Sequence, residues 1–173
     1  MDIQRLGPGF AEAYRQLMLE AYALHPEAFT SSPREREGLP LAWWESRLAE
    51  GAQAKERVWA ATEGSALLGV AGLSRETREK ARHKATLFGM YVPDCHRRLG
   101  IGRKLVATLM AQAKQDPTLR VVQLTVTEGN RAAQALYEQA GFITFGIEPM
   151  AVAVGTSFVS KIHLWCDLDK LRV

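Results

Sequence analysis

The chain has 173 residues, enough for one compact domain with a sizeable core. Its residues are 47% hydrophobic and 24% charged, a composition that argues against a disordered chain. The net charge is +3, from 22 Lys and Arg against 19 Asp and Glu, and it argues against a strongly basic nucleic-acid-binding surface. The N-terminal "MDIQRLGPGF" lacks the apolar run of a signal peptide, no segment approaches the ~18 apolar residues of a membrane span, and two cysteines make no disulfide framework. We therefore expect a single cytoplasmic domain over residues 1–173, with no nucleic-acid or membrane partner.

The N-terminal third predicts two amphipathic helices joined by a loop. Apolar residues recur at three- and four-residue steps over residues 9–24, as on one face of a helix. The next stretch, "HPEAFTSSPRE" (25–35), is expected to be a loop, because its two prolines disfavour helix. A second, shorter helix is expected over 39–51, with Pro40 near its start and Gly51 closing it.

The rest of the chain alternates strands and helices. Two apolar runs separated by Glu-Gly-Ser predict a hairpin, and Gly141 fits the position after a helix end. The strand–helix–strand unit over 84–126 should place its two strands parallel. The fold class we expect is α/β (α+β), a mixed sheet packed by helices. The expected elements are strands 57–62, 66–74 and 84–92, helix 102–114, strand 121–126, helix 130–142, and strands within 142–147 and 150–168 with a turn at Gly155 and Thr156.

Two closely spaced glycines, Gly100 and Gly102, lie between a predicted strand and helix, in "CHRRLGIGRK". At a helix start, four backbone N–H groups lack intrahelical partners and the helix dipole is positive, so a phosphate can bind there. The glycines would let the backbone come close to phosphate oxygens, and Arg97, Arg98 and Arg103 would add charge-assisted bonds. The same residues fit a tight turn with solvated charges equally well.

A second candidate pair is Asn130 and Tyr137, seven residues apart on one predicted helix. Seven residues are close to two helical turns, so the two side chains should point within ~20° of the same direction. Taken singly, Asn130 also fits a helix cap, and Tyr137 also fits a core position.

The two patterns together resemble the GNAT superfamily of acetyl-CoA-dependent N-acetyltransferases, in its small bacterial form. The matching stretches are R-x-x-G-x-G (97–102) after "LFGMYV", and "LTVTEGNRAAQALYEQAGF" (124–142). The resemblance covers almost the whole chain, and it implies a mostly antiparallel twisted sheet with a central pair of splayed parallel strands. It implies acetyl transfer from acetyl-CoA (coenzyme A) to a primary amine of a small molecule or protein, without a metal. A non-catalytic acyl-CoA-binding sensor or scaffold is the alternative.

The resemblance also implies roles for single residues. Tyr137 would be the catalytic general acid that protonates the departing thiolate. Asn130 would bond the pantetheine arm, the strand ending at Val92 would pair with its amides, and the loop after that strand would hold the pyrophosphate. The implied cofactor-binding set is Met90, Tyr91, Val92, Arg97, Arg98, Leu99, Gly100, Ile101, Gly102, Arg103 and Asn130.

The sequence does not single out a general base. Histone-acetylating members of the family carry a glutamate on the strand before the loop, and the matching position here is Thr86, which cannot take a proton from the amine. An ordered water, or a carboxylate such as Glu148, Glu27 or Glu20, remains open. Glu27 and Glu148 are also the residues expected to touch the substrate. The resemblance further implies a possible homodimer through the C-terminal strands.

Overall fold

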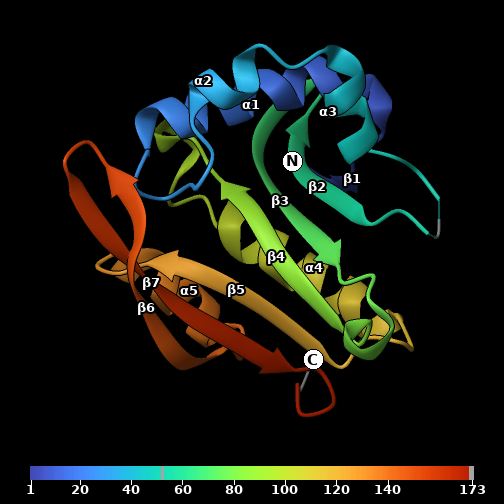
Figure 1. Ribbon diagram of the computed structural model, residues 1–173. Coiled ribbons are helices and arrows are strands. Elements are labelled where there is room, and N and C mark those ends of the chain that lie inside the picture. Colours follow the sequence, from blue (N-terminus) through green and yellow to red (C-terminus); the bar gives the residue numbers. More distant parts are fainter. Residues whose placement is uncertain (52, 172–173) are drawn as a thin grey trace.

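The computed structural model, which describes residues 1–51 and 53–171, has one mixed sheet with helices on both faces (Figure 1). Its strands are β1 (Asp2–Arg5), β2 (Glu56–Glu63), β3 (Ala66–Arg75), β4 (Lys84–Tyr91), β5 (Val121–Thr127), β6 (Ile143–Val154) and β7 (Ser157–Asp167). They lie in the order β1-β2-β3-β4-β5-β7-β6. Every neighbouring pair is antiparallel except β4 and β5, which are parallel. The predicted fold class and the parallel central pair are confirmed.

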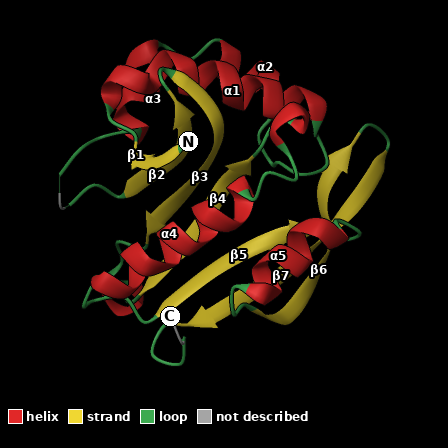
Figure 2. Cartoon of the chain, turned by 180° about the vertical axis from the view of Figure 1, so that it is seen from behind, coloured by secondary structure: helices red, strands yellow, loops and turns green. Residues whose placement is uncertain are grey.

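Two groups of helices cover the two faces of the sheet, as the views in Figures 1 and 2 show. The described helices are α1 (Ala11–Leu24), α2 (Pro33–Glu37), α3 (Leu41–Arg47), α4 (Ile101–Gln115) and α5 (Arg131–Gln139), with single 3-10 turns at Pro8–Phe10, Glu79–Ala81 and Asp94–His96. Helices α1 and α3 pack on one face, and α4 and α5 pack on the other. Within the described residues, no helix is both long enough and apolar enough to cross a bilayer.

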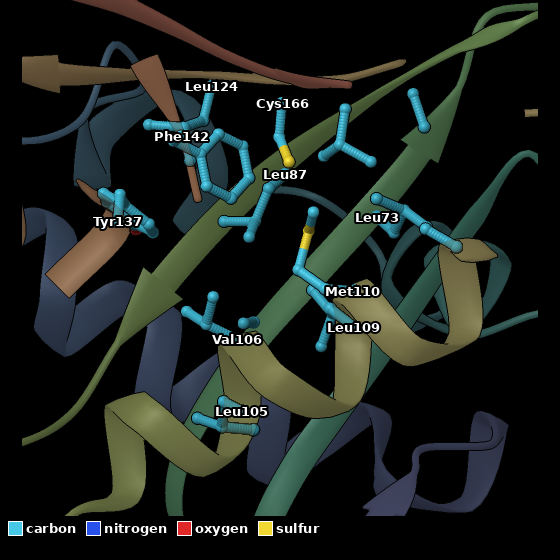
Figure 3. Packing of buried hydrophobic residues seen from close by; sticks show 14 of the residues in the cluster. Leu73, Leu87, Leu105, Val106, Leu109, Met110, Leu124, Tyr137, Phe142 and Cys166 are labelled. Atoms are coloured by element: carbon cyan, nitrogen blue, oxygen red, sulfur yellow. The ribbon is translucent and has the colours of Figure 1, made fainter. Parts of the chain in front are cut away.

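Each face of the sheet has its own apolar core. On the α4 side, Leu105 and Leu109 pack with Leu87 of β4 in a continuous cluster (Figure 3). On the α1 side, Trp44 is fully buried and meets the ring of Tyr14 edge-on at a centroid distance of 5.9 Å. The apolar period of the helices, visible in the sequence, produces these two faces because it places one side of each helix against the sheet.

The parallel strands β4 and β5 pair only at their beginning. The paired positions end at Thr86, opposite Gln123, and the two strands then diverge in a V (Figure 1). β5 continues in register with β7, while β4 follows β3 through an irregular stretch that contains Gly89, whose φ of +60° favours glycine. Beyond Thr86, the edge of β4 that faces β5 therefore has no strand partner among the described residues.

The prediction of a loop over 25–35 is wrong at its end, where α2 begins. Pro33 occupies the first turn, where its missing N–H costs no hydrogen bond. Ser32 accepts a bond from the Glu35 N–H at 3.3 Å, and the Glu35 carboxylate accepts from the Ser32 N–H at 2.8 Å, which completes a capping box. The proline therefore starts a helix instead of preventing one.

Three further elements differ from the prediction. Helix α3 ends at Arg47, and its C-cap is the buried Leu48, whose backbone angles are no longer helical. The helix therefore ends before Gly51, which was expected to close it. The C-terminal strand β6 runs without a break over two register shifts, where two strands were expected. Strand β1 was not predicted, since its four residues are held by pairing with distant β2.

Candidate functional site

A cleft of about 320 Å³ opens where β4 and β5 separate. Both strands, helix α5 and the segment 28–31 contribute to its wall, together with single side chains from α1, α2, α3 and β7. The residues of the wall that matter for its chemistry are Thr86, Met90, Asn130, Tyr137, Arg36 and Lys161. Three of the predicted site residues, Met90, Asn130 and Tyr137, are thus brought together from separate elements.

Tyr137 lines this cleft from α5. Only 5% of the residue is exposed, and its ring meets Phe142 edge-on at 5.9 Å (Figure 3). Its hydroxyl has no hydrogen-bond partner within the described part of the chain. Burial raises the pKa of the Tyr137 phenol well above its ordinary value, because the charged phenolate would lose its hydration. The group is therefore protonated at neutral pH, as a proton donor must be.

Asn130 also lines the cleft, and it is the N-cap of α5. Its side-chain oxygen accepts the Ala133 N–H at 3.1 Å, which fixes the side chain at the helix start. Because that bond uses only the oxygen, the two N–H donors of the amide remain for a ligand. The cap and the predicted ligand contact are thus compatible.

The loop before α4 has the geometry of an anion site. Gly100 is the N-cap with φ +75°, and Arg98 also has a positive φ, of 65°. The first helical hydrogen bond runs from the Lys104 N–H to the Gly100 carbonyl at 3.1 Å, so the N–H groups that precede Lys104 in the helix lack intrahelical acceptors. These donors and the positive helix end favour an anion such as a phosphate.

The two loop glycines are required for different reasons. A Cβ at Gly100 would meet no atom within 4 Å, so this position needs glycine for its backbone angle and is open to an approaching ligand. A Cβ at Gly102 would lie 3.1 Å from the Met90 side chain and 3.3 Å from that of Leu136. Gly102 therefore lets α4 pack closely against β4 and α5, and this packing is a reason for glycine in addition to the predicted approach to phosphate.

The predicted arginines separate into two kinds. Arg97 is engaged by its neighbours: Nη1 lies 2.8 Å from the Asp94 carboxylate, Nε donates to the Val92 carbonyl at 3.1 Å, and Nη2 is 3.2 Å from His25. Arg98 and Arg103 are exposed, and no ion pair of either is found among the described residues. Of the three predicted arginines, Arg98 and Arg103 therefore have side chains that are not already paired within the described part of the chain.

None of the three candidate carboxylates lines the cleft. Glu20 accepts a hydrogen bond from the Tyr91 hydroxyl at 2.9 Å, Glu148 pairs with His163 at 2.9 Å, and Glu27 lies 3.8 Å from His25. Thr86 does line it, at the last paired position before the strands part. The position that matches the family's glutamate is therefore in the cleft, but it carries no carboxylate.

The sequence reasoning missed Lys161 and Arg36, both of which line the cleft. Lys161 is 6% exposed, and its Nζ donates to the Ala28 carbonyl at 2.9 Å and to Thr127 Oγ1 at 3.2 Å. Burial lowers the pKa of this lysine. The available signal was a single lysine in the middle of β7, directly before the alternating apolar residues Ile162 and Leu164. For Arg36, which lies between the expected loop 25–35 and the expected helix 39–51, no comparable signal existed.

A larger apolar groove of about 810 Å³ lies elsewhere, between α4, α5 and the end of β7. Of the predicted site residues, only Arg103 lines it. Among the described residues, no cluster of His, Cys, Asp or Glu side chains could hold a metal ion. The predicted general acid, Tyr137, lines the smaller cleft and not this groove.

Comparison with known protein families agrees with this geometry. The model of the Acetyltransferase (GNAT) family matches residues 13–142. The chain belongs to this family. It is therefore a GNAT acetyltransferase, and the family uses acetyl-CoA as its acyl donor and acts on amines in general. No curated protein sequence matches the chain.

Solved structures show the same fold. A GNAT-family acetyltransferase from Streptococcus pneumoniae has a TM-score of 0.84 at 21% identity, over 95% of this chain and 97% of that one. The putative acetyltransferase yncA from Salmonella typhimurium, solved with acetyl-CoA, has a TM-score of 0.80 at 20% identity, over 100% and 96%. A ribosomal-protein-alanine N-acetyltransferase from Brucella melitensis has a TM-score of 0.79 at 20% identity, over 96% of this chain and 99% of that one.

Proposed function

We propose that this GNAT acetyltransferase moves an acetyl group from acetyl-CoA to a primary amine of a small molecule or protein by direct attack, with Tyr137 as the general acid. The observation that carries the proposal is the Tyr137 phenol: it is buried, held protonated and without a hydrogen-bond partner among the described residues, in the wall of the cleft between β4 and β5. Such a group can donate its proton without first breaking another bond.

The donor would lie along β4. Its pyrophosphate would accept hydrogen bonds from the free backbone N–H groups of residues 98–103 at the start of α4. Its pantetheine arm would extend into the gap beside Met90, Tyr91 and Val92, where β4 has an unpaired edge, as an added strand would. The amide of Asn130 would donate to the same arm. Support comes from the end of strand pairing at Thr86, because it leaves backbone donors and acceptors of β4 available.

In the transfer itself, the amine nitrogen attacks the thioester carbonyl carbon, a C–N bond forms and the C–S bond breaks. The nitrogen loses one proton, and the sulfur of coenzyme A takes one from Tyr137, so that the products are an N-acetyl amide and the free thiol. Tyr137 then regains a proton from solvent. No covalent enzyme intermediate is needed. For the amine proton we propose an ordered water as acceptor, since Glu20, Glu27 and Glu148 lie outside the cleft wall.

The test is the release of coenzyme A thiol across an amine panel, for the wild type and Tyr137→Phe. A general acid predicts a loss of kcat with unchanged coenzyme A affinity, measured by calorimetry. Unchanged turnover in Tyr137→Phe would remove this residue from the mechanism. If the wild type binds coenzyme A and turns over no amine, the chain is an acyl-CoA sensor or scaffold instead.

We further propose that the protein forms a homodimer through β6. We also propose that it is located in the cytoplasm. β6 is an edge strand, and large apolar side chains are exposed on β6 and β7. The two thiols are unpaired, as expected in a reducing compartment. Light scattering of the wild type and of Ile147→Lys tests the dimer, which the charge should disrupt. The exposed apolar residues are Ile143, Phe145, Ile147, Met150 and Phe158.

A further inference from the structure

Three cationic side chains line the cleft, and none of the lining residues is an Asp or Glu. They are Arg36 from α2, Arg47 from α3 and Lys161 from β7. Helices α2 and α3 pack with α1, on the face of the sheet opposite α4 and α5. Because a cleft lined by one sign of charge attracts ligands of the opposite sign, this wall favours an anion.

The three cations differ in how far their charge is already compensated. Arg47 forms an ion pair with Glu56 at 3.2 Å. Lys161 has only neutral oxygens as partners, the Ala28 carbonyl and Thr127 Oγ1. Arg36 also has a neutral partner, Ser31, and within the described residues neither Arg36 nor Lys161 forms an ion pair with a carboxylate. Among the described residues, Arg36 is thus the cation of the wall without a carboxylate partner, whereas Glu148, the cross-strand neighbour of Lys161, and Glu27 partly compensate the charge of Lys161.

Arg36 is held in a defined orientation. Its Nε and Nη2 donate to Ser31 Oγ at 3.2 and 2.9 Å, and its guanidinium carbon lies 4.7 Å from the centre of the Trp43 ring. A guanidinium has five N–H donors, of which Ser31 takes one from Nε and one from Nη2. The donors on Nη1 and the second on Nη2 form a free edge, which suits two oxygens of a carboxylate or phosphate.

The diphosphate of the donor is not the natural partner of Arg36. In the proposed function the diphosphate binds the loop before α4, and none of residues 97–103 lines the cleft. With about 320 Å³, the cleft must also receive the reacting end of the donor, so the part of the acceptor that enters it has to be small. The anion that Arg36 can bind therefore belongs to the acceptor.

We infer that the acceptor is a small amine that carries an anionic group, a carboxylate or a phosphate, and that Arg36 binds this group while Lys161 adds a second positive charge. Amino acids and aminoalkyl phosphates have this chemistry. The inference rests on the proposed acetyl transfer and restricts the class of amine within it. Arg36 would thus determine the acceptor specificity of the enzyme.

The test uses pairs of amines that differ in the anionic group: L-amino acids against their amides, and O-phosphoethanolamine against ethanolamine. Thiol release should show a higher kcat/KM for the anionic member in one of the two series, which also separates carboxylate from phosphate. In Arg36→Gln this preference should fall by about 10- to 100-fold, mainly through KM, as expected for hydrogen bonds to a charged group. Arg36→Lys should keep part of it.

Arg34→Gln is the matched control, since Arg34 lies on the same helix, is exposed and does not line the cleft. It should keep the preference of the wild type. A wild type that favours the uncharged amines, or a preference that survives in Arg36→Gln, would overturn the inference. A purely structural role of Arg36 would lower the rates for both members of a pair and leave their ratio unchanged, which would also overturn it.

A binding experiment separates this inference from the proposed function. In the presence of coenzyme A, calorimetry compares N-acetyl amino acids and N-acetyl-O-phosphoethanolamine with their uncharged counterparts. Absence of turnover with every amine would contradict the proposed function, while tighter binding of the anionic products, lost in Arg36→Gln, would still support the anion site. Equal binding of charged and uncharged products would contradict the anion site even if acetyl transfer occurs.

Discussion

The loop before α4 and the wall formed by α2, α3 and β7 offer positive charge to a ligand in two different ways. The loop presents backbone N–H groups of consecutive residues, and Gly100 gives these groups their direction. The wall presents side chains, Arg36 and Lys161, which come from distant parts of the chain and are held by Ser31, Ala28 and neighbouring groups. The donor side should therefore depend on backbone geometry, and the acceptor side on single side chains.

The largest effect is expected for Gly100→Glu. The substitution forces a side chain onto a left-handed backbone, φ +75°, and sets a carboxylate against the diphosphate. Coenzyme A affinity, measured by calorimetry, should fall by about 100-fold or more, since like charges in contact cost several kcal/mol. Gly64→Glu is the control, because Gly64 has φ +59° and open space in the β2–β3 turn, and it should bind normally. Retained affinity in Gly100→Glu would mean that the diphosphate binds elsewhere.

Tyr137→Phe should lower kcat by about 100-fold, the lower range for loss of a general acid. Coenzyme A affinity and the free energy of unfolding should stay close to the wild type, because the hydroxyl has no partner among the described residues to lose. Since its pKa is raised, the phenol keeps its proton as pH rises, and kcat of the wild type should not fall on the alkaline side until pH exceeds about 10, the ordinary pKa of tyrosine. A pH–rate profile measures this, and an alkaline fall below that pH would contradict the assignment.

Lys161→Met should raise the KM of the acceptor by about 10-fold, because it removes a positive charge from the acceptor side of the cleft. It also removes the two hydrogen bonds of Nζ to Ala28 and Thr127. One of these bonds ties β7 to the segment that includes Ala28, and Thr127 binds the same segment through the Glu27 carbonyl at 2.7 Å. Steady-state kinetics gives KM, and calorimetry should show an unchanged affinity for coenzyme A. Lys170→Met, at a lysine whose side chain is 82% exposed, should leave both unaltered. An equal loss on the donor side would show that Lys161 supports the whole cleft.

The smallest effect is expected for Arg98→Gly. The substitution removes an exposed charge beside the diphosphate but relieves the positive φ of 65° at this position. Coenzyme A affinity should fall by only about 3-fold, as for other exposed charges, and the loss should shrink with added salt. Calorimetry at two ionic strengths measures it. A loss as large as that in Gly100→Glu would show that the side chain, and not the backbone, dominates the donor site.

Much of the fold could be predicted because its signals are local. The apolar period of α1 and α4, the Glu-Gly-Ser turn and the glycine after α5 each act within a few residues. Strand β1 was missed because its stability comes from pairing with β2, and α2 was missed because Pro33 was interpreted as a breaker although Ser32 and Glu35 form a capping box. In both cases the deciding interaction was outside the pattern that was considered.

The sequence alone determined the family resemblance, the loop before α4 and the pairing of Asn130 with Tyr137 on one helix, since each depends on residues close together in the chain. Only the tertiary structure decided which charges share the cleft. It excluded Glu20, Glu27 and Glu148 from the wall and brought in Arg36 and Lys161. The physical reason is that side chains meet across the sheet only after distant strands and helices have packed, and no local pattern records which of them will face the same space.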